Sequence, residues 1–453
     1  MTASRRNWVR SFSRKKVAIG TLPPITIALA VAAGPGDVGL FALAVSAAVT
    51  LYNPVYAVPM LIVATAFRQL RSVADIPFGW LVIAGCWVGA AVHVLVRSAF
   101  LKPIGIERPY LVLGFVWGVC GIMTTLNVEP GWVSLLYFLG TIALLGVISL
   151  VIGTHKQQRG LRHEENQLLW VYIVGIVNLA VLVSSLMRYS ARDLAAARTA
   201  ELSLRVVAFS PRPLANMFGL AAVVCLVTFV ASRQSIAGRI AVLFLGLAST
   251  VGLIYTGARM PFASMIFGTA VAILYAGYVR NRVFSRTTIR AILIITIAVV
   301  VLVALPTIPA ERLPFAEGTE GLRLLREAEL DDNLRFRIWS RYVAQITPMQ
   351  LAFGSGVNGF DDIIGTNPHS VFVGAFSSFG MIGAAALLAL LVFTGNQVLR
   401  ARAPAAAGAL VYSIAAMTTS YDINRPDFWV MLMVVLLIGR PNTRSLNRQN
   451  SAA

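Results

Sequence analysis

Apolar segments of the length needed to cross a lipid bilayer recur along the whole chain. They are about 17–23 residues long, and about fourteen of them can be placed. The composition agrees, because 57% of the 453 residues are hydrophobic and only 13% are charged. A soluble domain carries more charge than this, and the segments lack the alternation of a membrane β-barrel. The sequence therefore predicts an all-α, polytopic helical membrane protein.

The number of spans depends on two short segments near 38–67, which Asn53-Pro54 interrupts. They are either two spans or one re-entrant or tilted element, so we expect about 12–14 transmembrane helices. At the N-terminus, Pro23-Pro24 and the lack of a small-residue cleavage site favour a retained helix over a cleaved signal peptide. The segments lie at about 17–33, 38–52, 54–67, 78–97, 109–126, 131–152, 167–187, 211–231, 239–256, 260–279, 288–305, 370–393, 404–420 and 427–439.

The net charge of +19 comes from basic residues at the ends of the apolar segments, not from one basic surface. This distribution argues against a nucleic-acid partner and follows the bias of cytoplasmic loops toward lysine and arginine. Fourteen crossings with the N-terminus inside place every lysine on the cytoplasmic side: Lys15, Lys16, Lys102 and Lys156. We therefore expect both termini to be cytoplasmic.

The longest connection between apolar segments falls on the outer side in this topology. A loop of this length is expected to have structure or function of its own. Its second half predicts a short amphipathic helix on the outer leaflet, in which Leu334, Ile338, Tyr342 and Ile346 recur every four residues. The predicted organisation is a basic tail at 1–16, transmembrane helices at 17–305, an extracytoplasmic loop with short helices at 306–369, transmembrane helices at 370–439 and a tail at 440–453.

Several classes of chemistry leave no signature here. Cys86, Cys120 and Cys225 all lie inside apolar stretches, where cysteine usually acts as a small buried hydrophobe. The sequence has no Walker motif, dinucleotide fingerprint, zinc-ligand spacing or paired intramembrane carboxylates. We therefore expect no cofactor and no metal site.

His369 is the candidate catalytic residue. It lies in Thr366-Asn367-Pro368-His369-Ser370, where the outer loop meets an apolar segment, and a glycine-rich stretch and several arginines precede it. Ionisable groups at membrane sites tend to be functional. Fixed positive charge nearby disfavours the imidazolium, and a neutral imidazole can accept a proton as a general base. The alternative is that this segment is only a capped helix start.

The other histidines carry weaker signals. His93 lies within an apolar helix, so it is either functional or shares a polar helix end with Arg97. His155 and His163 sit in a basic loop, where we expect them to be solvated.

Arginines near the outer face are candidate ligands for phosphate, because a planar guanidinium matches phosphate oxygens. Arg259 follows a very short turn, which holds it close to the membrane, although it is alternatively an interfacial side chain. Arg205 precedes Ser210-Pro211, and spacing alone does not separate it from its neighbours. Further possible substrate contacts are Arg335, Arg337, Arg341, Asp422 and Arg425.

Three stretches resemble a known family. They are RVVAFSPRPLANMFGL at 205–220, TGARMPFASMIFGTAVAIL at 256–274, and LRFRIWSRYVAQITPMQLAFGSGVNGF with NPHSVFVGAFSSFGMIG within 334–383. In their order and spacing they are similar to motifs of the bacterial O-antigen ligase and polymerase superfamily. The chain departs from the family pattern in having Ser-Pro-Arg-Pro, Ala258-Arg259-Met260 and His369-Ser370, where His-Asn is common. These departures bear on the substrate more than on the family.

The resemblance implies an enzyme that transfers a glycan from a polyprenyl-diphosphate carrier to an acceptor sugar or lipid-anchored acceptor. It implies that His369 is the base, that Arg205 and Arg259 hold the diphosphate, and that the protein sits in the bacterial cytoplasmic membrane and acts at its outer face. Such chemistry is inverting and needs no metal, since a diphosphate is a good leaving group. The alternative is a transporter or flippase for lipid-linked glycans, with midplane polar residues and broken helices in both halves.

Overall fold

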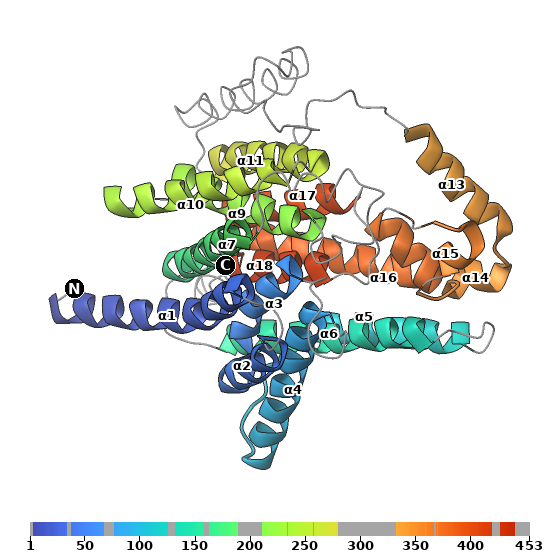
Figure 1. Ribbon diagram of the computed structural model, residues 1–453, viewed down its shortest axis with the longest axis horizontal. Helices are drawn as coiled ribbons and strands as arrows, with labels where there is room; N and C mark the ends of the chain where they lie inside the picture. Colours follow the sequence, from blue (N-terminus) through green and yellow to red (C-terminus); the bar gives the residue numbers. More distant parts are fainter. Residues whose placement is uncertain are drawn as a thin grey trace, which may run out of the picture.

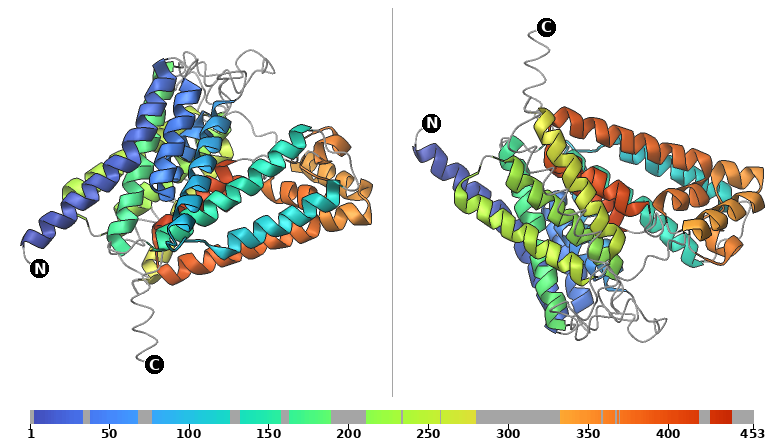
Figure 2. Two further views of the ribbon diagram at one scale, coloured as in Figure 1. Left: turned by 90° about the horizontal axis from the view of Figure 1, so that it is seen from below. Right: turned by 90° about the horizontal axis from the view of Figure 1, so that it is seen from above.

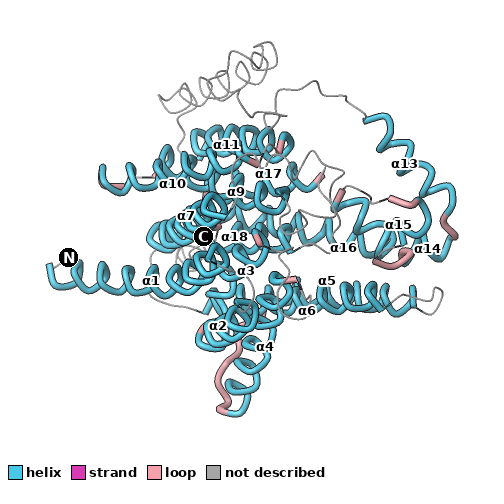
Figure 3. Tube along the Cα trace, in the orientation of Figure 1, coloured by secondary structure: helices cyan, strands magenta, loops and turns pink. Residues whose placement is uncertain are grey.

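The computed structural model is built from helices packed along and across one another (Figures 1 and 3). Within the part of the chain that it describes, all regular elements are helical. The described residues are 3–33, 38–67, 77–125, 132–157, 163–188, 211–232, 234–256, 258–279, 332–357, 359–366, 368, 370–418 and 426–439.

The predicted polytopic all-α membrane fold is confirmed. Seven helices in the described residues are long and apolar enough to cross a membrane, and six shorter apolar helices accompany them. Every predicted segment coincides with a helix except 288–305, which lies outside the described residues. Helix α1 (Ala3–Ala33) begins well before the predicted apolar segment, because arginine and lysine propagate a helix readily.

The N-terminal helices pack closely through small residues. Gly85 and Gly89 of α4 lie against the backbone of α2, beside Ser46 and Thr50. Small residues spaced by four let two membrane helices approach closely. The elements of this group after α1 are α2 (Val38–Tyr52), the short 3₁₀ helix η1 (Pro54–Tyr56), α3 (Ala57–Ala66) and α4 (Phe78–Ala99).

Asn53-Pro54 separates α2 from η1 and α3, as the sequence predicted. The Asn53 side chain accepts a hydrogen bond from the backbone N–H of Val55 at 3.2 Å. Nδ1 of His93 lies 2.8 Å from the carbonyl oxygen of Leu51, just before the break. Polar groups must be satisfied within the protein in a bilayer, so His93 has a structural role at this point.

Two short helices are buried along their whole length. Every residue of α3 is buried, and so is every residue of α18 (Pro426–Ile438). Helix α18 contacts both α3 and α7. Helices α7 (His163–Arg188), α9 (Pro211–Ala231) and α17 (Pro404–Met417) pack against them. Farther out, α10 (Ile236–Tyr255) packs on α7 and α9, and α11 (Arg259–Val279) packs on α9 and α17.

Three helices extend from this core toward one end of the molecule, and we call them the arm (Figure 2). They are α5 (Arg108–Thr125), α6 (Trp132–Gln157) and α16 (Val371–Ala401). At the far end of the arm lie three short helices that we call the cap: α13 (Asp332–Gln345), α14 (Pro348–Phe353) and α15 (Gly359–Ile364). The cap comes from the predicted outer loop and contacts α5 and α16.

Candidate functional site

The cap is joined to the arm by two glycines in positive-φ conformations. Gly380 interrupts α16 with φ 64° and ψ −169°, a region that is essentially open only to glycine. Gly354 ends α14 with φ 92°. A Cβ atom on Gly380 would collide with the backbone of Ala352 and Phe353, and one on Gly354 would collide with that of Ser378 and Phe379. The two backbones therefore pack directly against each other.

Hydrogen bonds close the same junction. The N–H of Ser355 donates to the carbonyl of Ser377 at 2.7 Å, just before the break in α16. The hydroxyl of Tyr342 lies 2.7 Å from Oγ of Ser355 and donates to the same Ser377 carbonyl at 3.3 Å. From α5, Oγ1 of Thr124 lies 3.4 Å from the carbonyl of Phe353. Backbone groups that the helix break leaves free are thus satisfied within the protein.

The amphipathic pattern of α13 predicted that Tyr342 faces the outer leaflet, but its side chain packs within the protein. It is 1% exposed, and its ring packs on Phe360 at 4.7 Å between centroids. The predicted apolar face of α13 thus covers α15 and α16 at this position, because the cap offers its own apolar partner. Burial raises the pKa of Tyr342, opposed by the Ser355 hydrogen bond. Its hydroxyl therefore remains protonated, and able to donate, throughout the physiological pH range.

The residues on both sides of His369 are held in place. Nε1 of Trp339 donates to the carbonyl of Pro368 at 2.9 Å. Ser370 is buried and caps α16, where its Oγ accepts from the N–H of Val373 at 3.5 Å. His369 itself lies outside the described residues, and so does Asn367.

The structure describes some of the predicted arginines and not others. Arg259 is the first residue of α11, directly after a short turn, as the sequence predicted. Arg335 lies in α13, and Arg337 and Arg341 are exposed on the same helix. Arg205, Asp422 and Arg425 lie outside the described residues. The described side chains therefore neither place these groups together nor separate them.

The helices that follow Arg205 and Arg425 begin side by side. Nδ2 of Asn216, in the second turn of α9, donates to Oδ2 of Asp427 at 2.8 Å, in the first turn of α18. Both residues are buried. The hydroxyl of Tyr412, from α17, donates to the Asn216 carbonyl at 3.0 Å. A polar link of this kind holds apolar helices in one register.

Arg259 lies at the same end of the molecule as the start of α9. Gly252, in the last turn of α10, is so close to Phe218 of α9 that a Cβ would meet the ring at 2.9 Å. The end of α10 is therefore level with the first turns of α9, and the α10–α11 turn leads directly to Arg259. The N-termini of α9, α11 and α18 thus gather at one end, where helix dipoles favour anions.

An aromatic cluster joins this end of the core to the arm. The Trp117 ring, from α5, stacks on Phe379 at 4.3 Å and meets Trp429 edge-on at 5.5 Å. Phe379 directly precedes the α16 break, and Trp429 lies two residues after Asp427. Nε1 of Trp117 also donates to the Gly383 carbonyl at 3.1 Å. The α16 break and the start of α18 therefore share one packed core.

Comparison with known families gives an independent assignment. Residues 241–388 match the family described as O-Antigen ligase. This match supports membership of the O-antigen ligase and polymerase superfamily. The match includes Arg259, the Gly354–Gly380 junction and His369. No curated protein matches the chain. At the level of the family, this membership supports glycan transfer of the O-antigen ligase or polymerase type by a multi-pass membrane protein.

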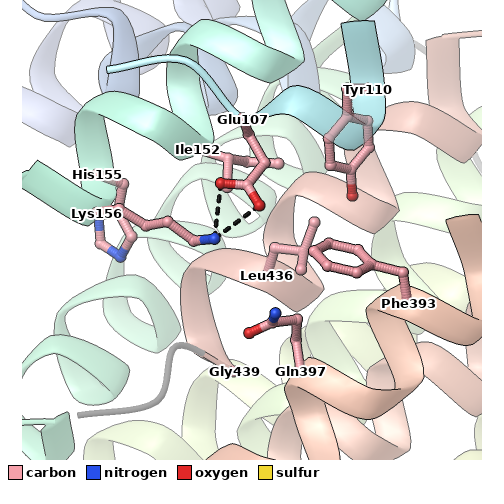
Figure 4. Close-up of a pocket in the computed structure, with 9 residues that line it drawn as sticks. All are labelled: Glu107, Tyr110, Ile152, His155, Lys156, Phe393, Gln397, Leu436 and Gly439. Atoms are coloured by element: carbon pink, nitrogen blue, oxygen red, sulfur yellow. Dashed lines mark hydrogen bonds and ion pairs between the residues drawn. The ribbon is translucent and has the colours of Figure 1, made fainter. Parts of the chain in front are cut away.

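A small cavity at the opposite end of the arm is a competing candidate (Figure 4). Nζ of Lys156 lies 2.7 Å from Oε1 and 2.6 Å from Oε2 of Glu107, which is 10% exposed. His155 is buried, which contradicts the expectation of a solvated side chain, and its Nε2 lies 3.2 Å from Nδ2 of Asn166. The cavity measures about 10 Å³, which is room for one water molecule. It is therefore too small for a substrate.

Sequence reasoning missed the residues that build the junction. It noted the glycine-rich stretch that contains Gly354 but gave no role to Gly380, Thr124 or Ser377. Only Gly380 left a signal, as a glycine within a long apolar helix. The Thr124 hydroxyl and the Ser377 carbonyl bond to cap residues more than 30 positions away, so local sequence does not reveal their partners.

Proposed function

We propose that the protein transfers a glycan from a polyprenyl-diphosphate carrier to an acceptor sugar at the outer face of the bacterial cytoplasmic membrane. The observation that carries the proposal is the family match, which includes both Arg259 and His369 in one stretch. The partners would be a lipid-linked glycan donor, a glycan or lipid-anchored acceptor, and membrane lipids.

In the proposed step, the acceptor hydroxyl oxygen attacks the anomeric carbon of the donor glycan. A new C–O bond forms as the bond to the diphosphate oxygen breaks, and the electron pair leaves with the diphosphate carrier. His369 takes the hydroxyl proton as general base. Attack opposite the leaving group inverts the anomeric centre.

Arg205 and Arg259 would balance the charge that grows on the leaving diphosphate. Guanidinium groups bind phosphate oxygens with paired, charge-assisted hydrogen bonds, and preorganised cations stabilise such a leaving group. Two features support this role. Arg259 opens a helix, and the N-termini of α9, α11 and α18 lie at the same end of the core. Further contacts would come from Arg335, Arg337, Arg341, Asp422 and Arg425.

A flippase for lipid-linked glycans is the alternative, and the helix breaks bear on it. A break occurs in each half, at Asn53-Pro54 and at Gly380. In transporters, however, unwound backbone is left available for substrate or ions. Here His93 lies against the Leu51 carbonyl, and Ser355 and Tyr342 donate to that of Ser377. The breaks therefore fit structural joints better than a transport site.

The first prediction concerns His369→Ala. If the histidine is the base, transfer by purified protein falls by a factor on the order of a hundred or more. Expression and thermal unfolding remain like those of the parent. The measurement is transfer from a lipid-linked donor to its acceptor in proteoliposomes, with and without a chelator, which should have no effect. His163→Ala is the matched control, and it retains full transfer.

Two results would contradict this assignment. Normal transfer by well-folded His369→Ala would exclude a catalytic role for the histidine. Loss of transfer with a chelator, restored by added metal, would mean that the chemistry depends on a metal ion.

The second prediction concerns Arg259. Lysine keeps the charge but loses the planar fork, so Arg259→Lys impairs transfer less than Arg259→Ala does. Arg205 should behave alike, whereas Arg192→Ala and Arg198→Ala are tolerated. The assay measures the initial rate over a range of donor concentrations. An equal loss of transfer in the alanine variants of Arg192, Arg198, Arg205 and Arg259 would show that none of these arginines has a specific role in the site.

A further inference from the structure

Trp339 links the cap to the peptide bond that leads into His369. Its indole Nε1 donates to the carbonyl of Pro368 at 2.9 Å, and Pro368 is buried. The indole N–H is a donor only, and partial burial shields the bond from water. The carbonyl of Pro368 and the amide nitrogen of His369 belong to one planar peptide unit. A hydrogen bond that fixes the carbonyl therefore fixes the orientation of that unit.

The donor itself sits on a fixed helix. Three residues after Trp339, Tyr342 is buried against Phe360 and bonded to Ser355. On the other side of His369, the Ser370 carbonyl accepts from the N–H of Gly374 at 2.8 Å, as the first turn of α16 requires. The chain is thus restrained just before and just after His369, by two different elements.

We propose that Trp339 is a positioning residue for His369: its hydrogen bond to Pro368 fixes the peptide unit that leads into the histidine. This inference rests on the proposed function. Trp339 touches neither substrate nor reacting atoms in this scheme and acts through the histidine alone. General bases are sensitive to such placement, because an error of about 1 Å can cost on the order of a hundredfold in rate.

The test replaces the indole by a ring without a donor. Trp339→Phe keeps most of the packing and removes the hydrogen bond. We expect kcat to fall on the order of tenfold, with an unchanged KM for the lipid-linked donor. Trp87→Phe is the matched control, since Trp87 is 50% exposed on α4, and it transfers normally. Trp339→His retains a ring N–H and recovers part of the lost rate.

A double-mutant cycle separates positioning from a general structural role. In the His369→Ala background, Trp339→Phe causes no further loss of the residual transfer, because there is no base left to position. An equal fold loss in both backgrounds would overturn the inference, and so would full activity of Trp339→Phe. Normal transfer by His369→Ala, in contrast, would overturn the proposed function. The two failures are therefore distinguishable.

Discussion

The two ends of the arm are held together by different physical means. At the cap end, Gly354 meets Gly380, and hydroxyl and backbone groups complete the junction without buried charge. At the opposite end, Glu107 and Lys156 form an ion pair, and Gly105 packs directly on Gly153. Helix α5 runs from one end to the other, a separation of roughly 25 Å.

The contrast shows that the most conspicuous polar cluster need not be the site. The Glu107–Lys156 pair satisfies itself, and the cavity beside it is about 10 Å³. At the cap end, Arg337 and Arg341 are exposed. Exposed basic side chains are therefore present at the cap end, within the stretch that the family match covers.

The largest effect on transfer at the cap end is expected from a substitution of Gly380. Gly380→Ala places a Cβ against the backbone of Ala352, at a φ of 64° that alanine rarely adopts. The strain is about 1–3 kcal/mol before the collision is counted. We expect transfer to fall on the order of a hundredfold, and hydrogen exchange of α14 to rise. Rates and exchange are measured on the same purified protein.

The control for this variant is Gly118→Ala. Gly118 lies within α5, and an added Cβ there would meet nothing within 4 Å. Alanine in a helix is more stable than glycine by roughly 0.5–1 kcal/mol, so this variant keeps full activity. Wild-type transfer by Gly380→Ala would show that the docking of α14 on the broken helix is irrelevant to function.

Much of the fold was predictable because it follows from local composition. A long apolar run without alternation crosses a bilayer as a helix, so spans such as 78–97 and 211–231 were placed to within a few residues. The break at Asn53-Pro54 was predictable, because proline lacks the N–H that continues a helix. The arm was not predictable, since which helices pack together depends on contacts far apart in sequence, such as Trp117 with Trp429.

The candidate site was predictable only in part. Motif residues such as Arg259 appeared at a helix start, where the sequence placed it. The supporting residues did not follow from pattern. The four-residue spacing identified the apolar face of α13, yet spacing cannot say whether Tyr342 faces lipid or protein. Likewise, a basic loop predicted a solvated His155, but the ends of α6 and α7 bury it.

The smallest effect on transfer should come from the opposite end. Lys156→Met leaves Glu107, only 10% exposed, without its cation, and a buried hydrogen bond to a charged group contributes roughly 1–3 kcal/mol. We expect the thermal unfolding midpoint in detergent to fall by several degrees, with kcat per folded molecule unchanged. Glu107→Gln should cost less, because Lys156 is 40% exposed and can turn to water.

A double variant tests whether the Glu107–Lys156 pair acts only on stability. Replacing both partners of an ion pair is often nearly neutral, since no uncompensated charge remains, so the double variant Glu107→Gln/Lys156→Met regains part of the stability. The matched control is Lys102→Met, because Lys102 is an exposed lysine near the same end. It changes neither the unfolding midpoint nor kcat. A large loss of kcat in stable Lys156→Met would break the contrast, because catalysis would then depend on the end of the arm that we assign to structure alone.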